Sequence, residues 1–193
     1  MKVIRVLLFT FISFGLLVTF LPAQATVSET RQSATLIDGK RFISTEGGFS
    51  IEIAVAPTET TDFGTETSKK KGVDIGKHYL WKFEKTTYTI MYSPSLDSNG
   101  DPATQTLEEV SSGTRKGLLR SGAKLLSERS ILFLNKYPGI EFRYITVGGD
   151  KFVNRSFLVD STGYQVEGAF SDLKDEKEVL ATLDSFKLLN DEK

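Results

Sequence analysis

The stretch that decides the fold is "NRSFLVDSTGYQVEGAF", residues 154–170. Its second half alternates with a period of two, with Tyr164, Val166, Gly168 and Phe170 on one face and Gln165, Glu167 and Ala169 on the other. Such alternation is typical of a strand with one packed face and one more open face. The turn residues Ser161-Thr162-Gly163 precede it. The stretch therefore predicts two antiparallel strands, 152–159 and 164–170.

Further strands are predicted upstream of this pair, because short aromatic and β-branched runs alternate with turn residues. They cover residues 41–45, 49–54, 78–83, 87–92, 124–135 and 140–147. Tyr137-Pro138-Gly139 predicts a type II turn, since proline fixes its own φ and the following glycine accepts a positive φ. The result is an antiparallel meander.

Two helices complete the pattern. Thr106 and Glu109 have the N-cap to N3 spacing of a capping box, and Asp175 with Glu178 forms an acidic variant of it. Each pair precedes a helical stripe of apolar residues, which ends near Leu118 in the first helix and near Phe186 in the second. We expect an α+β fold with a central antiparallel β-sheet flanked by helices, in a single domain over residues 41–190.

The N-terminus predicts a targeting segment. A basic start, an apolar run and the small-residue site Ala23-Gln24-Ala25 indicate a cleaved signal peptide over residues 1–25. Residues 26–40 are polar and small, and we expect a flexible tether there. The sequence predicts an exported protein without a membrane span after cleavage, placed in the periplasm, the extracellular space or a thylakoid lumen.

The amino-acid composition excludes some classes of function. The chain has no cysteine, which excludes disulfides and thiol catalysis. It carries 24 basic and 25 acidic residues, and removing Lys2 and Arg5 leaves 22 against 25, a net charge of −3. That balance, together with export, argues against a nucleic-acid partner.

One stretch could bind calcium. Asp97, Asn99, Asp101 and Glu108 match positions 1, 3, 5 and 12 of a calcium loop. The same string fits a turn running into a capped helix. Position 6 is Pro102 instead of glycine, and no helix is predicted to lead into the loop. We expect no metal, and a calcium-dependent accessory protein using residues 97–108 remains the first alternative.

No residue is assigned to catalysis, cofactor binding or metal binding. His78 is the only histidine and lies in an aromatic strand, and no G-x-S-x-G nucleophile elbow is present. Lys69-Lys70-Lys71 is typical of a solvated surface. Tyr79, Trp81 and Phe83 share a face that favours core packing. We therefore expect a protein that is not an enzyme, with a hydrolase using an unrecognised acid pair as the second alternative.

Four segments resemble the PsbP-like family. They are "FISTEGGFSIEI" (42–53), "YPGIEFRY" (137–144), "NRSFLVDSTGYQVEGAF" (154–170) and "VLATLDSFKLL" (179–189). The resemblance implies an α/β/α sandwich, and it carries no catalytic residue set. The combined expectation is an exported, soluble, non-enzymatic binding or assembly module. It would present a sheet edge and loops, among them residues 57–72, to a protein partner whose identity the sequence does not give.

Overall fold

A computed structural model of the protein describes residues 34–37, 40–63, 76–95 and 103–191. Three predicted features lie outside these ranges. They are the signal peptide over residues 1–25, the Lys69-Lys70-Lys71 segment and the Asp97, Asn99 and Asp101 positions of the calcium alternative.

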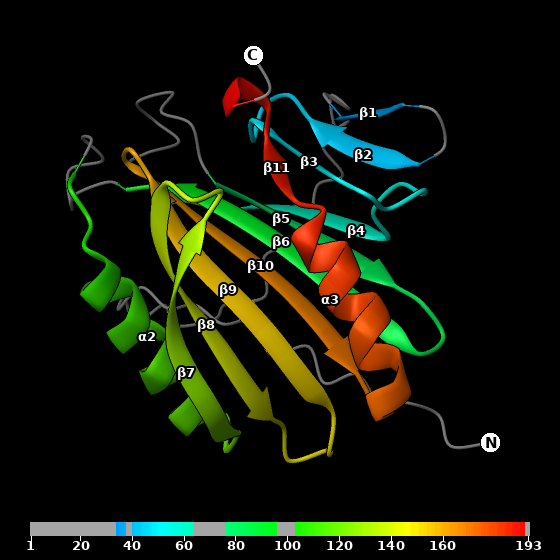
Figure 1. Ribbon diagram of the computed structural model, residues 1–193, viewed down its shortest axis with the longest axis vertical. Coiled ribbons are helices and arrows are strands. Elements are labelled where there is room, and N and C mark those ends of the chain that lie inside the picture. Colours follow the sequence, from blue (N-terminus) through cyan, green and yellow to red (C-terminus); the bar gives the residue numbers. More distant parts are fainter. Residues whose placement is uncertain (1–33, 38–39, 64–75, 96–102, 192–193) are drawn as a thin grey trace, which may run out of the picture.

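The central layer is a seven-stranded antiparallel sheet with the order β4-β5-β6-β10-β9-β8-β7 (Figure 1). Its strands are β4 (Glu59–Phe63), β5 (Gly76–Lys82), β6 (Thr86–Pro94), β7 (Lys124–Phe133), β8 (Tyr137–Ile145), β9 (Lys151–Val159) and β10 (Thr162–Phe170). β7 to β10 form the expected meander, and β10 returns to pair with β6. The turn before Thr162 lets both predicted strands pair along their full lengths.

A second, four-stranded sheet has the order β1-β2-β3-β11. Its strands are β1 (Ala34–Ile37), β2 (Arg41–Ser44), β3 (Phe49–Ile51) and β11 (Lys187–Leu188). β1 falls inside residues 26–40, where we expected a flexible tether, and it pairs antiparallel with β2. The sheet thus joins strands from the two ends of the described chain.

The helices lie on opposite faces of the large sheet. α3 (Glu176–Asp184) and the small sheet cover one face, here called the α3 face, and α2 (Leu107–Arg120) covers the other, the α2 face (Figure 1). Two short 3-10 turns, η1 (Leu173–Asp175) and η2 (Leu189–Asp191), flank the C-terminal elements. The predicted α+β fold, with a central antiparallel sheet between flanking layers, is confirmed.

The main core lies on the α3 face and is built from aromatic rings. Phe186, which follows α3, stacks on Phe49 at 5.2 Å between ring centroids, and Phe133 stacks on Phe157 at 4.1 Å. Gly168 allows α3 to approach the sheet, because a Cβ there would overlap the side chain of Val179. Rings of this size dominate core burial, so the C-terminal residues complete the core.

The predicted type II turn was wrong. Tyr137-Pro138-Gly139 is not a turn but the start of β8. The turn is instead formed by Leu134 and Asn135, with φ of 50° and 54°, and Lys136 N donates to Phe133 O at 3.0 Å. Positive φ at both central residues is the hairpin geometry that matches strand twist. The glycine at 139 serves a close approach, since a Cβ there would lie 2.7 Å from a backbone oxygen.

The two capping predictions had different outcomes. At α2 the capping box is present, with Glu109 N donating to Thr106 Oγ1 at 3.2 Å and Thr106 N donating to Glu109 Oε2 at 2.8 Å. At α3 the predicted N-cap Asp175 makes no side-chain cap bond. Asp172 instead accepts from Lys174 N at 3.1 Å and caps η1. The loop expected over residues 57–72 also contains an element, the edge strand β4.

Candidate binding surface

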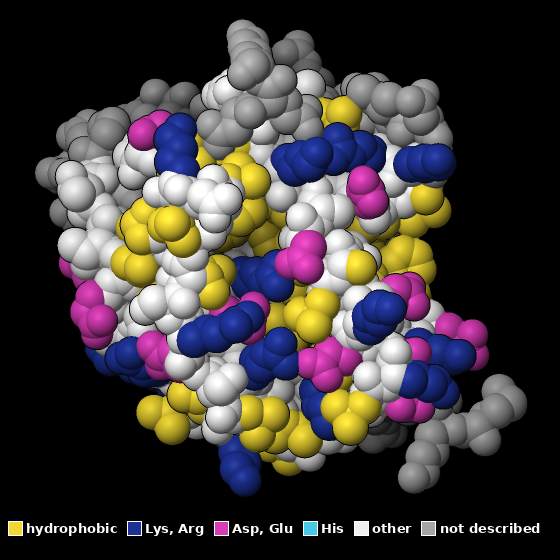
Figure 2. All heavy atoms as spheres, viewed as in Figure 1, with side chains coloured by type: hydrophobic (Ala, Val, Ile, Leu, Met, Phe, Trp, Pro, Cys, Tyr) yellow, Lys and Arg dark blue, Asp and Glu magenta, His cyan; other side chains and the backbone are white. Residues whose placement is uncertain are grey.

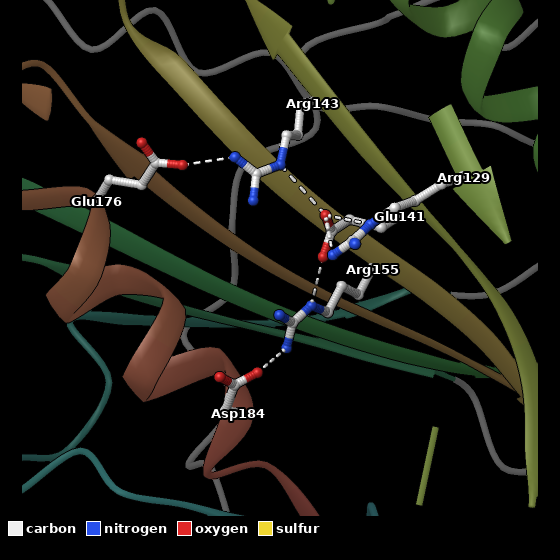
Figure 3. A network of polar contacts seen from close by, with 6 residues as sticks. All are labelled: Arg129, Glu141, Arg143, Arg155, Glu176 and Asp184. Carbon is white, nitrogen blue, oxygen red and sulfur yellow. Dashed lines mark hydrogen bonds and ion pairs between the residues drawn. The ribbon is translucent and has the colours of Figure 1, made fainter. Parts of the chain in front are cut away.

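The largest group of charged side chains surrounds Glu141, whose side chain is 1% exposed on the α3 face (Figure 3). Arg129 Nη2 and Arg143 Nε reach Glu141 Oε1 at 2.8 and 3.2 Å, and Arg155 Nε donates to Oε2 at 3.0 Å. These residues come from β7, β8 and β9, where Glu141 lies directly between Arg129 and Arg155 in the strand register. The alternation of the strands therefore places the cluster on one face.

Two carboxylates of α3 complete this network. Arg143 Nη1 donates to Glu176 Oε1 at 2.5 Å, and Arg155 Nη1 donates to Asp184 Oδ1 at 2.6 Å. Three arginines thus face three carboxylates (Figure 3). Burial alone would raise the pKa of Glu141, but hydrogen bonds from Arg155 and Arg143 outweigh it and lower the pKa. Glu141 is therefore held in its ionised form. The network of which it is the centre links the sheet to α3 through Glu176 and Asp184.

A second carboxylate, Glu167, is half-buried on the α2 face and has neutral partners. Tyr144 Oη donates to Glu167 Oε2 at 2.6 Å and Asn154 Nδ2 donates to the same oxygen at 2.9 Å. Burial raises the pKa of Glu167, and these two hydrogen bonds offset part of the rise. Burial and the neighbouring Glu167 also raise the pKa of Tyr144 well above its usual value.

These two carboxylates do not form an acid pair. In the strand register, Glu141 lies opposite Arg155 and Glu167 lies opposite Asn154. Asn154 and Arg155 are adjacent residues of β9. Successive residues of a strand point to opposite faces, so Glu141 and Glu167 are separated by the sheet. A glycosidase-type mechanism needs two carboxyl groups on one substrate, about 5–10 Å apart. Glu141 and Glu167 lack that arrangement.

An open hollow of about 410 Å³ lies between α3 and the β5–β6 turn. Its lining includes the acids Glu52, Glu84, Asp175 and Glu178 and the exposed ring of Phe83. Ligand sites of known chemistry are mostly apolar and enclose most of their ligand. This hollow is open and acidic, and we assign no ligand to it.

β7 is one of the two edge strands of the large sheet. β7 ends the sheet, and within the described ranges no strand pairs with its outer side. It is ten residues long, against five for β4 at the other end. We call residues 127–133 of this strand the open edge. An unpaired strand presents a row of N–H and C=O groups that can pair with another chain.

Side chains of the open edge are exposed on both faces. Leu132 is 57% exposed on the α2 face, and the Arg129 side chain is 62% exposed on the α3 face. Figure 2 shows hydrophobic side chains on the side of the molecule that β7 forms, beside the dark blue basic groups. The edge is held firmly, because Glu141 binds Arg129 and Phe157 stacks on Phe133.

The residues considered from the sequence as possible site residues lie in separate parts of the structure. Tyr79 and Trp81 are buried in the core as expected, whereas Phe83 lies beyond the end of β5 and is exposed. His78 is half-buried on the α2 face, where burial lowers its pKa. Glu108, the last position of the calcium alternative, lies in the first turn of α2 with Arg115 Nη1 at 3.6 Å. The calcium alternative itself stays untested.

The sequence alone does not reveal the clusters around Glu141 and Glu167. It shows Glu141 and Arg143 only within the segment "YPGIEFRY", and Glu167 only on the more open face of a strand. An alternation signal could have placed Glu141 and Arg143 on one face of β8, because they are two residues apart. Their partners on β7, β9 and α3 depend on strand register, which the sequence does not specify.

No protein-family model matches the sequence, and no curated protein matches it. Among solved structures, the fold is similar to the solution structure of cyanobacterial PsbP (CyanoP) from Synechocystis sp. PCC 6803. The TM-score is 0.49 and the identity 13%, over 77% of this chain and 91% of that chain. The likeness is one of fold alone. In the part of the chain that the structure describes, no helix is long and apolar enough to cross a membrane.

Proposed function

We propose that the protein is an exported, non-enzymatic binding module whose open edge adds an extended segment of a protein partner to the large sheet. The observation that carries the proposal is the outer side of β7, which no other described strand pairs with and which has exposed side chains on both faces. In strand addition, main-chain hydrogen bonds supply affinity and the alternating side chains supply specificity.

The occupant that fits is a different protein and not a second copy. A two-fold axis normal to the sheet pairs residues of the same face in antiparallel strands. Dimers centred on residue 128 or 129 would place Glu128 opposite Glu128 or Arg129 opposite Arg129. A dimer centred on Ser130 would place each charge opposite an apolar side chain, Glu128 opposite Leu132 and Arg129 opposite Ile131. Like charges directly opposite each other destabilise a strand pair. The charges therefore favour a heterotypic partner.

The side chains of the open edge define the chemistry of the partner strand. The residue opposite Arg129 should be acidic, and the residue opposite Leu132 should be apolar. Because these two positions lie on opposite faces, the partner segment should alternate, with an acidic side chain on one face and apolar ones on the other. The ion pair with Glu141 holds Arg129 in place before binding, which reduces the entropy lost on association.

Two alternatives have weaker support. A hydrolase with an acid pair is disfavoured because Glu141 and Glu167 lie on opposite faces of the sheet. A calcium-dependent accessory protein would show a higher melting temperature in millimolar calcium than in chelator, since an ion bound only by the folded state stabilises it. We expect identical melting curves.

The experiment places a photo-crosslinking amino acid at Ser130 on the open edge and, as the control, at exposed Lys177 on α3. We expect discrete adducts from position 130 in the native host, and none of them from position 177. Mapping should find an extended segment with alternating character. The purified partner should then bind the Leu132→Lys variant at least tenfold more weakly than the wild type. Equal adducts from both positions, or unchanged affinity of the variant, would contradict the proposal.

A further inference from the structure

One end of the molecule gathers exposed aliphatic side chains that the open edge does not use. It comprises the last turn of α2 (116–120), the start of β7 (124–126) and the β8–β9 turn (146–150), and we call it the α2–β7 end. These segments lie close together, since a Cβ on Gly122 would be 3.1 Å from Val147 Cγ2. Lys124 also pairs with Ile145, the last residue of β8. In Figure 1 they form the lower end of the molecule.

The aliphatic side chains of this end contribute little to the core. Leu119 is 77% exposed and Val147 is 81% exposed, and Leu126 at the β-bulge of β7 is exposed as well. The β8–β9 turn is closed by Thr146 N donating to Asp150 O at 2.9 Å, and Gly149 supplies the positive φ. The turn therefore does not need a valine. Figure 2 shows hydrophobic side chains along this lower edge.

Basic side chains lie beside the exposed aliphatic side chains of the α2–β7 end. Lys116, three residues before Leu119, is its neighbour on the exposed side of α2, Arg120 is exposed at the end of this helix, and Lys124 begins β7. Arg120 has a local role, because a cation is favourable near a helix C-terminus. That role does not explain Lys124 or the exposed aliphatics. The acid of the β8–β9 turn, Asp150, accepts a hydrogen bond from Ser171 at 2.8 Å.

We propose that the α2–β7 end docks on a lipid bilayer with anionic headgroups. Leu119, Leu126 and Val147 would enter the headgroup–acyl boundary while Lys116, Arg120 and Lys124 meet the anionic surface. Peripheral proteins combine these two contributions, apolar insertion and attraction of basic residues. The contact is distinct from a membrane span and independent of the partner strand on the open edge.

The shape of this end favours a bilayer over a protein. Its apolar side chains project from a helix terminus and a glycine turn, so they stand out from the surface instead of lining a groove. A protein-binding site concentrates its energy in well-packed pockets that exclude water. Projecting aliphatics surrounded by cations instead match an interface that is apolar inside and anionic at its surface.

The test is flotation of the mature-length protein with vesicles of pure phosphatidylcholine and of phosphatidylcholine with phosphatidylglycerol. We expect binding to the anionic vesicles that weakens as salt rises, since surface charges are screened. Each basic residue near such a surface contributes about fivefold to partitioning. The Lys116→Glu, Lys124→Glu variant should therefore bind more than tenfold more weakly, and the Leu119→Ser, Val147→Ser variant about tenfold more weakly.

Matched controls lie elsewhere on the surface. Lys40→Glu makes the same type of charge change near β2, and Leu132→Ser removes an equally apolar side chain from the open edge. Both should bind within about twofold of wild type. A Val147→Trp reporter should shift its emission to the blue on anionic vesicles. Equal flotation with both vesicle types, absence of flotation, or controls that weaken binding as much as the variants would overturn the proposal.

Discussion

Each face of the large sheet carries one carboxylate with little exposure to water, and the two carboxylates have different kinds of hydrogen-bond partner. Glu141 on the α3 face is buried among three arginines, whereas Glu167 on the α2 face is bound by a tyrosine and an asparagine. The first carboxylate has a lowered pKa and the second a raised one. A buried carboxylate with cationic partners is stabilised in its charged form, and one with neutral partners is not.

The two helices are also attached to the large sheet in different ways. α3 carries two of the carboxylates that bind the arginines of the sheet, so it is fastened by charge as well as by the ring cluster. α2 contacts the sheet mainly through Leu118, and Arg115 binds Glu128 of β7. We expect changes on the α3 face to cost more stability than changes on the α2 face.

The largest effect should follow Glu141→Gln. The variant leaves three guanidiniums around a neutral group, and breaking a buried ion pair from one side costs about 3–5 kcal/mol. We expect about 3 kcal/mol, the lower end, because Arg129 keeps most of its side chain in water. Urea unfolding at neutral pH measures the change. A loss below about 1 kcal/mol would mean that the network contributes no more than a surface ion pair.

Gly168→Ala tests the packing of α3 against β10. The new methyl group would overlap Val179, whose branched side chain has little freedom to move. Overpacking of this kind costs about 1–3 kcal/mol. Thermal unfolding should show the loss, and Gly163→Ala is the control because the space beside it is open to ordinary contact. Equal stability of both variants would show that α3 can shift without cost.

Thr106→Ala tests the attachment of α2. The substitution removes the cap bond to Glu109 N and should lower the free energy of unfolding by about 0.5–2 kcal/mol. The loss should be the same in calcium and in chelator, because the cap acts through the backbone. A Thr106→Ser variant keeps the hydroxyl and should retain most of the stability. A calcium-dependent loss would favour the metal-loop alternative.

Glu167→Gln should have the smallest effect at neutral pH and the opposite pH dependence to Glu141. Since the folded pKa of Glu167 is raised, its contribution is present below the unfolded pKa and is lost as pH rises through the folded pKa. The lowered pKa of Glu141 gives stability that is present above the unfolded pKa and lost as pH falls through the folded pKa.

Unfolding measured from acid to neutral pH checks both signs. Relative to wild type, Glu167→Gln should be least favourable in acid and should gain stability as pH rises. Glu141→Gln should lose most at neutral pH and approach wild type in acid. If the two difference curves have the same slope, the contrast between the two carboxylates is wrong.

The sequence predicted individual helices and strands better than it predicted which of them pair or pack together. The period of two over residues 164–170 and the cap at Thr106 are local signals, and both were confirmed. The turn at Tyr137-Pro138-Gly139 was wrong because a proline near the start of a strand and a glycine at a close approach give the same local signal as a turn. The hairpin turn instead uses Leu134 and Asn135, and leucine rarely adopts a positive φ.

The candidate surface could be anticipated only in outline. A sheet edge was expected to meet a partner, but which strand would be the edge depends on the order β10-β9-β8-β7, a nonlocal property. The network around Glu141 depends on the register of β7, β8 and β9 and on where α3 packs. Single-residue patterns carry no register, so these contacts could not be derived from the sequence.

The small sheet has a consequence for the order of folding. β11 pairs with β3, and Leu189 N donates to Gly48 O at 2.9 Å, so the last described strand closes a sheet begun near the start of the chain. Loop-closure entropy must be overcome before such distant contacts form, which slows folding. A ribosome delivers the N-terminal strands first. Phe49 therefore stays without its stacking partner Phe186 until residue 186 has emerged, and a chaperone that holds the exposed ring would limit aggregation during this interval.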